Sequence, residues 1–262
     1  MEPTSAIFDD ASAIVAAIED HVSYLRITLA APPDEGWIPC ADLVEDGRNL
    51  AGSIEATQAG RKAPDLQVTA SLWFQSYAFR VAIPVVAPFA LDLPGLSADP
   101  STTAIRVARD RPAAVAVTDP AVIERSAPRA ADDLFGSHLE PLVDAITREV
   151  TVGRRLLWGN ATASVATVLR ALEGAPGADR QRVRTRAGEL LEAAAEWTGG
   201  LGRFDLVTEG DREGWFWTRT NCCLYERCEG AARCDDCSLI PAAELEAGRR
   251  ASLLASESEV AS

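Results

Sequence analysis

The spacing of the cysteines constrains this chain more than any other feature of its sequence. Five of the six cysteines lie within one 16-residue window: Cys222, Cys223, Cys228, Cys234 and Cys237. Cys40 stands alone. A chain of 262 residues can bury a sizeable core without disulfide staples, so clustered thiols in a reducing compartment indicate metal or redox chemistry.

The window contains an adjacent pair, ten intervening residues and then a C-x2-C pair. A C-x2-C turn brings two thiolates to one metal, and the adjacent pair completes four sulfurs, as a zinc site or an iron–sulfur cluster requires. Neighbouring side chains on an extended strand diverge, so the backbone must turn at Cys222-Cys223. Structural zinc sites usually repeat the C-x2–4-C spacing on both sides. A [2Fe–2S] cluster is wider and accepts adjacent cysteines, so this spacing favours the cluster and leaves zinc as the alternative.

Net charge excludes one class of partner. The chain has 25 Lys and Arg against 39 Asp and Glu, which gives a formal charge of −14. A surface this acidic repels nucleic acids and anionic lipids. The first 12 residues hold no basic residue, unlike a secretory signal, and the apolar stretch 81–96 is broken by prolines and an aspartate. We therefore expect a cytoplasmic protein with no integral membrane segment and no bound nucleic acid.

Hydrophobic periodicity predicts a helix-rich α+β fold with a small β element and a C-terminal cysteine-rich iron–sulfur segment. Helices are expected over 5–24, weakly over 41–57, from 68 until Pro84 and Pro88 kink or end it, and over 132–150, 154–172 and 180–197. Short β-favouring runs at 104–107 and 113–118 predict a hairpin. The expected domains are a helix-rich substrate-binding body (1–202), a cluster-binding segment (203–240) and a flexible tail (241–262).

The C-C-x10-C-x2-C pattern near the C-terminus resembles that of the ferric siderophore reductases of the FhuF-like family. Two further stretches are similar to elements of that family: Ser71-Leu-Trp-Phe-Gln-Ser-Tyr-Ala-Phe-Arg80 followed by Pro84, and Leu156-Leu-Trp-Gly-Asn-Ala161. The resemblance implies a [2Fe–2S] cluster whose ligands are Cys222, Cys223, Cys234 and Cys237. Cys228 is additional to the family pattern. Plant-type ferredoxin spacing is matched only in its first step, by Cys223 and Cys228.

The resemblance also implies an activity, the one-electron reduction of an Fe(III)-siderophore in the cytoplasm to release Fe(II). Hydroxamate siderophores hold Fe(III) in six hard oxygens and hold Fe(II) far more weakly. No catalytic residue beyond the cluster is then needed, and the electron would come from a donor such as a ferredoxin or a flavin reductase. The net charge of −14 favours neutral or cationic hydroxamate chelates over anionic catecholate or citrate chelates, unless Arg80, Arg219, Arg227 and Arg233 gather around the cluster and reverse the local charge. A zinc-stabilised, non-catalytic binding module and an iron–sulfur carrier serving another enzyme stay open as alternatives.

Four side chains outside the cysteines are candidates for substrate contact: Trp73, Arg80, Trp217 and Arg219. Core packing for the tryptophans and solvation for the arginines are the competing interpretations. We expect Asp235 and Asp236 to face solvent, Cys40 to be a buried apolar residue, and the histidines His21 and His138 to lie at the surface or at helix caps.

Overall fold

The computed structural model describes residues 3–30 and 36–255. The α-helices of these residues are α1 (Pro3–His21), α2 (Cys40–Glu45), α3 (Gly47–Arg61), α4 (Leu66–Ala90), α5 (Ala127–Ala131), α6 (Glu140–Glu149), α7 (Arg154–Glu173), α8 (Arg180–Ala193), α9 (Ala195–Thr198) and α10 (Ala242–Ala255). The strands are β1 (Thr28–Leu29), β2 (Trp37–Pro39), β3 (Gly95–Leu96), β4 (Thr103–Val107), β5 (Pro112–Val117), β6 (Val122–Ile123), β7 (Gly202–Glu209) and β8 (Arg212–Arg219). A helix-rich α+β fold is confirmed.

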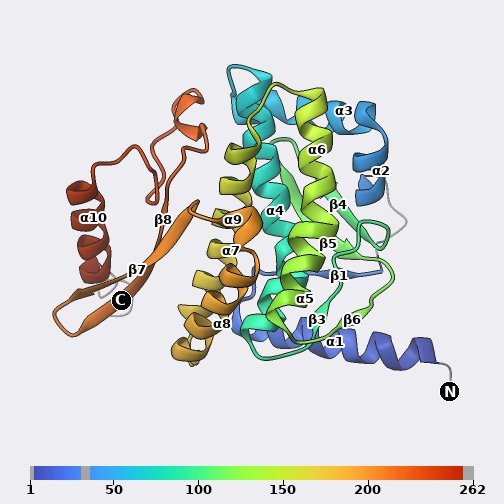
Figure 1. The fold of residues 1–262 in the computed structure, drawn as a ribbon, viewed down its shortest axis with the longest axis horizontal. Coiled ribbons are helices and arrows are strands. Elements are labelled where there is room, and N and C mark those ends of the chain that lie inside the picture. Colours follow the sequence, from blue (N-terminus) through green and yellow to red (C-terminus); the bar gives the residue numbers. More distant parts are fainter. Residues whose placement is uncertain (1–2, 31–35, 256–262) are drawn as a thin grey trace.

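The centre of the fold is α4, which lies against α7 and also contacts α3, α8 and β5 (Figure 1). Asp65 caps its start by accepting a hydrogen bond from the backbone N–H of Val68 at 2.9 Å. Four of its aromatic side chains are fully or almost fully buried, namely Trp73, Phe74, Tyr77 and Phe89. A helix that is apolar on all sides belongs in a core, which is where α4 lies.

Pro84 and Pro88 were expected to kink or end this helix near its middle, but they do not end it, because α4 continues through both residues to Ala90. Each proline removes one backbone hydrogen bond and crowds the preceding turn. Both prolines are buried, and α3, α7 and β5 pack around the helix. Burial of the surrounding apolar side chains offsets the cost of the missing bonds.

The predicted hairpin is confirmed, since β4 and β5 pair antiparallel from Thr103–Val117 to Val107–Pro112. It forms the middle of a four-stranded sheet in the order β1-β5-β4-β2, with β1 parallel to β5. One face of this sheet lies on α4, where Ile105, Val115 and Val117 join the main core. The turn between β4 and β5 lines a cavity beside α4.

The helix expected over 132–150 begins earlier and is not uniform. Ser126 caps α5 through the backbone N–H of Arg129, and a π-helical stretch (Asp132–Leu139) then leads into α6. The π-helical stretch contains Gly136, and Pro141 lies just after it, in the first turn of α6. The predictions of α7, and of a helix capped by Asp179, are confirmed. The helix expected over 41–57 is broken at Asp46 into α2 and α3.

The C-terminal part begins with the β7–β8 hairpin, which packs against α7 and carries α10 on its outer side (Figure 1). A flexible tail over 241–262 was expected, but residues 242–255 form α10, and 256–262 lie outside the described residues. Arg249 of α10 is buried and donates to the Trp217 carbonyl and the Thr218 hydroxyl, both at 2.7 Å. Arg250 of the same helix donates to the Thr208 carbonyl at 3.0 Å and to Glu209 at 2.8 Å, so several hydrogen bonds anchor this helix on the hairpin.

None of the helices in residues 3–30 and 36–255 has both the length and the apolar character needed to cross a bilayer.

His138 was expected at the surface or at a cap, but it is fully buried beside α4. Its Nε2 lies 2.6 Å from the Tyr77 hydroxyl, and its Nδ1 bonds to the Ala98 carbonyl. Burial lowers the pKa of His138 from 6.5 to about 4. His21, by contrast, is exposed in the last turn of α1, as predicted.

We predict that His138 makes folding sensitive to acid. The folded protein favours the neutral ring of His138. The contribution of this residue to the free energy of unfolding is therefore complete above pH 6.5 and is lost as the pH falls toward 4. The loss from this residue is about 3 kcal/mol over that range. Urea unfolding at pH 7.5 and pH 5 checks this. His138→Gln should have a smaller difference between the two pH values than the parent protein, and an equal difference would contradict the prediction.

Candidate metal centre

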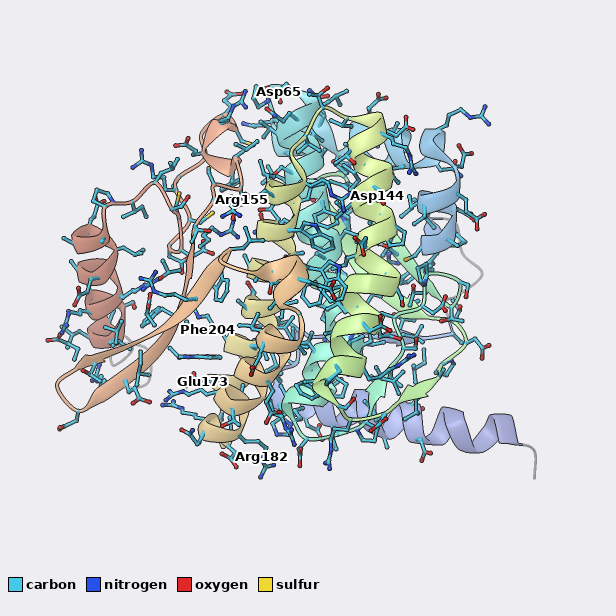
Figure 2. All side chains as sticks on the ribbon, in the orientation of Figure 1. Asp65, Asp144, Arg155, Glu173, Arg182 and Phe204 are labelled. Carbon is cyan, nitrogen blue, oxygen red and sulfur yellow. The ribbon has the colours of Figure 1, made fainter. Side chains whose placement is uncertain are left out.

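The cysteine-rich loop, residues 221–240, is docked on the first turns of α4. Cys223 and Cys228 pack against Val68 and Leu72 of that helix, and both cysteines are about 95% buried. On the outside of the loop Arg227 pairs with Asp65 at 2.7 Å. Figure 2 shows Asp65 at the end of the body that this loop approaches. The loop has little regular structure, so these contacts hold it in place.

Two helical residues fasten the loop from inside. Ser71 of α4 donates to the Cys223 carbonyl at 2.8 Å. Asn160 of α7 donates to both the hydroxyl and the carbonyl of Ser71, at 2.8 and 2.9 Å. Ser71 and Asn160 are both fully buried, so each of these bonds is sheltered from water. The backbone of a candidate ligand is thus bonded directly to the pair of central helices.

A buried ion pair closes the same network. Arg219, at the end of β8, donates from Nε to Asp236 at 2.9 Å, and its Nη1 lies 3.4 Å from the Asn160 side-chain oxygen. Only 2% of the Arg219 side chain is exposed, and 18% of Asp236. Asp236 lies inside the C-x2-C pair, so the ion pair joins that pair to α7. Asp236 was expected to face solvent, and this was wrong; Asp235 is exposed, as predicted.

The backbone turns where the adjacent cysteines require it. Leu224 has a φ of 68°, and its N–H lies 3.2 Å from the Cys222 sulfur. The N–H of Tyr225 bonds to Cys223. A leucine rarely adopts this left-handed conformation, which costs about 1–2 kcal/mol. The turn therefore aims two backbone donors at two neighbouring sulfurs, which is the arrangement that stabilises thiolates.

The thiols influence one another electrostatically. Donation from Cys234 lowers the pKa of Cys223, and the nearby charge of Arg219 acts in the same direction. The same bond raises the pKa of Cys234, with burial adding to the effect. Burial raises the pKa of Cys222. One thiolate, on Cys223, is thus favoured before any metal binds, whereas full ligation has to displace the remaining protons.

The donor set fits an iron–sulfur cluster in its chemistry. All five clustered thiols are unpaired by disulfides, Cys223 contacts Cys234, and Cys222 is close enough to both Cys223 and Cys237 to feel their charge. Among the residues that the structure describes, however, no three metal-binding side chains form a ready-made site. To bind one group together, four sulfurs would have to converge further than these side chains do.

The glycine of the Leu-Trp-Gly-Asn stretch allows the loop to approach α7. A Cβ on Gly159 would overlap the side chain of Asn221, the residue before Cys222. Asn221 reaches the Leu156 carbonyl at 3.4 Å from this position. Any larger residue at Gly159 would therefore require the Asn221 side chain to move.

We predict that Gly159→Ala destabilises the protein by about 1–3 kcal/mol, because the added methyl overpacks a buried contact. Gly188→Ala on α8 is the matched control, since a Cβ there meets nothing within 4 Å and should stabilise the helix by about 0.5–1 kcal/mol. Urea unfolding measures both changes. The double variant Gly159→Ala/Asn221→Ala should recover much of the loss. A single Gly159→Ala variant as stable as the parent would contradict the packing argument.

The structure separates the four candidate substrate residues. Trp73 is fully buried, stacks on Tyr77 at 5.1 Å and donates to Ser53, so it lies in the core. Trp217 is 3% exposed and packs against Ala163 and Ala166 of α7. Arg219 is buried in the network above rather than solvated. Of the four, Arg80 alone lines the cavity beside the loop.

Cys40 is fully buried beside Tyr77 and Thr103, as expected for an apolar core residue, and burial raises its pKa to about 11. Sequence reasoning missed Ser71 and Asn160 as fastening residues. The available signal was their polarity, because each is a polar residue on a helix whose neighbouring positions are apolar.

The comparisons with known proteins identify the family. The family model described as "Ferric iron reductase FhuF-like transporter" matches residues 71–212, more than half of the 262-residue chain. The chain belongs to this family. The FhuF-like match begins at Ser71 and includes Asn160, so it covers both fastening residues, and it ends before the first clustered cysteine. No curated protein is similar enough to this chain to count as a match. The family name is that of a ferric iron reductase, and the family suggests an iron–sulfur cofactor.

Proposed function

We propose that this protein is a [2Fe–2S]-dependent ferric siderophore reductase of the cytoplasm. Its cluster ligands would be Cys222, Cys223, Cys234 and Cys237, carried by a unit of residues 203–240 on the helical body. The electron donor would be a ferredoxin or a flavin reductase. Net charge alone favours a hydroxamate chelate as the substrate.

One observation carries the proposal. The region matched by the ferric reductase family ends before the cysteines, yet its helices α4 and α7 hold the cysteine loop: Ser71 bonds to the loop directly, and Asn160 bonds to Ser71 and to Arg219 of β8. Buried polar groups of this kind are costly unless each is satisfied. Buried hydrogen bonds between the body and one thiol-rich loop hold the thiols of that loop in a fixed position.

The bound cluster would supply one electron at a time, and one electron converts Fe(III) in the chelate to Fe(II). The chain's own residues hold and tune the sulfurs. Backbone N–H groups of Leu224 and Tyr225 donate to the sulfurs of Cys222 and Cys223, and Arg219 places positive charge near Cys223. Hydrogen bonds to sulfur and nearby positive charge stabilise the additional negative charge of a reduced centre. Siderophore oxygens hold Fe(II) weakly, so the metal leaves once it is reduced, and no general acid or base is required.

The test is the colour and the iron chemistry of the purified protein. Purified without oxygen, it should be reddish brown, contain about two irons and two sulfides per chain, and bleach with dithionite. The reduced protein, mixed with a ferric siderophore, should recover its colour as Fe(II) appears on a ferrous-specific chromogenic chelator, one Fe(II) per cluster.

Each alternative predicts a different result from the same experiment. A zinc-stabilised binding module is colourless and contains one zinc ion. An iron–sulfur carrier for another enzyme is coloured and bleaches, but it releases no Fe(II) from a siderophore. Either result would overturn the proposal.

A further inference from the structure

A cavity of about 370 Å³ lies between the body and the cysteine loop. Its walls come from α4, α7, the end of α3, the turn between β4 and β5, and the loop itself. The loop contributes Tyr225 and Cys234, and α4 contributes Phe79 and Arg80. The volume is within the range of small-molecule sites, about 300–1,000 Å³. A molecule bound here would lie directly against one of the candidate cluster ligands.

The charge of the cavity is opposite to that of the protein. Three arginines line it, Arg61, Arg80 and Arg111, and no carboxylate does so among the described residues. They come from three separate elements: α3, α4 and the β4–β5 turn. Coulombic repulsion makes such a group of like charges unfavourable unless an anion lies between them.

Two of these guanidinium groups have no carboxylate partner in the part of the chain that the structure describes. Arg61 donates only to neutral oxygens, the Asp110 carbonyl and the Ser76 hydroxyl. Arg80 lies over the Phe79 ring at 5.1 Å, and its buried Nε has no hydrogen-bond partner. Arg111 pairs with Asp110 at 3.5 Å but is half exposed. Unpaired buried donors of fixed charge are the groups expected to bind an incoming anion.

We propose that this cavity binds the Fe(III) chelate and selects chelates that carry a net negative charge on carboxylate or catecholate oxygens. This rests on the proposed reductase function and assigns its substrate site. The arginine fork matches such oxygens in geometry as well as in charge. Phe79 and Tyr225 supply the apolar part of the wall, and Cys234 brings the sulfur centre to the bound chelate.

The local arginines outweigh the net charge of −14. Exposed charges farther than about 8 Å from a ligand are largely screened at physiological salt. Charges in contact with the ligand in a partly buried cavity are screened much less. The overall field slows the approach of an anionic chelate, whereas the cavity decides how tightly it is held.

Gallium complexes test binding separately from reduction, because Ga(III) has the size and charge of Fe(III) but cannot be reduced under these conditions. Isothermal titration calorimetry on the cluster-containing protein should show binding of anionic Ga(III)–citrate and much weaker binding of cationic Ga(III)–desferrioxamine B. Arg80→Gln and Arg111→Gln should each weaken binding of the anionic complex about tenfold or more. Arg111 lies on an exposed turn, so Arg111→Gln tests the charge even where Arg80→Gln perturbs the helix.

Arg180→Gln is the matched control, because it removes the same charge from an exposed site on α8 that does not line the cavity. It should bind like the parent. Equal or tighter binding of the cationic complex, or unchanged binding in both cavity variants, would overturn the inference. Fe(II) release from ferric siderophores without arginine-dependent binding refutes this site and leaves the reductase proposal intact. Arginine-dependent binding of Ga(III)–citrate without any Fe(II) release supports the site and refutes the reductase proposal.

Discussion

Serine in place of any one of the four predicted ligands removes most of the visible absorption and most of the bound iron. The four variants are Cys222→Ser, Cys223→Ser, Cys234→Ser and Cys237→Ser. A serine hydroxyl is a poor substitute for a thiolate on iron, and each cluster iron needs its full set of protein ligands. Absorption spectra with iron and sulfide analysis measure the effect, and we expect losses of well over half in each variant.

Cys40→Ser is the control for the loss of a thiol, because Cys40 is buried in the core away from the loop. It should keep the full cluster content. Full cluster content in any of the four ligand variants would contradict the assignment of that cysteine as a ligand. Cys228 is the remaining thiol of the loop, packed against Cys223, Val68 and Leu72. We expect Cys228→Ser to keep its cluster. Loss of the cluster in this variant, together with retention in one of the four ligand variants, would show that Cys228 is a ligand in place of that cysteine.

Arg219→Met destabilises the protein by about 2–3 kcal/mol, because it leaves Asp236 without its ion-pair partner and removes a donor from Asn160. Loss of one member of a buried pair costs more than the pair contributes, since the remaining charge stays desolvated. Asp236 keeps some contact with water, which places the expected loss at the low end for a buried pair. Urea unfolding followed by circular dichroism measures it. Iron should also leave the variant faster when an external chelator is added.

The exposed ion pair between Arg227 and Asp65 is the matched control, because it also ties the loop to α4. Both of its side chains are 42% exposed, and exposed pairs contribute less than about 1 kcal/mol. Arg227→Met should therefore change stability and iron retention little. Similar losses in Arg219→Met and Arg227→Met would contradict the distinction between a buried fastening and a surface contact.

The fastening network and the cavity both lie where the loop meets the body. Ser71 and Arg219 bond to the loop at Cys223 and Asp236, while Tyr225 and Cys234 of the loop line the cavity. The helices α4 and α7 thus carry the fastening residues Ser71 and Asn160 and also form walls of the cavity.

The sequence by itself determined those features that depend on neighbouring residues. Periodic apolar residues predicted α1, α7 and α8, and Asp179 marked the start of α8 correctly. The turn between two β-favouring runs predicted the β4–β5 hairpin. The cysteine spacing predicted a thiol-rich loop with a turn at the adjacent pair, and the turn is confirmed at Leu224. Each of these is set within a few residues, where backbone geometry and hydrophobic period act directly.

Only the tertiary structure decided the rest, because the deciding contacts join distant parts of the chain. Ser71 bonds to Cys223 across 152 positions and to Asn160 across 89, and neither distance leaves a local pattern in the sequence. Burial by neighbouring elements carries α4 through two prolines, a balance that local propensity does not contain. The three cavity arginines belong to three elements, so their shared positive charge exists only once the chain has folded. Net charge is a sum over the whole sequence, whereas the charge that a ligand meets is set by which few side chains the fold brings together.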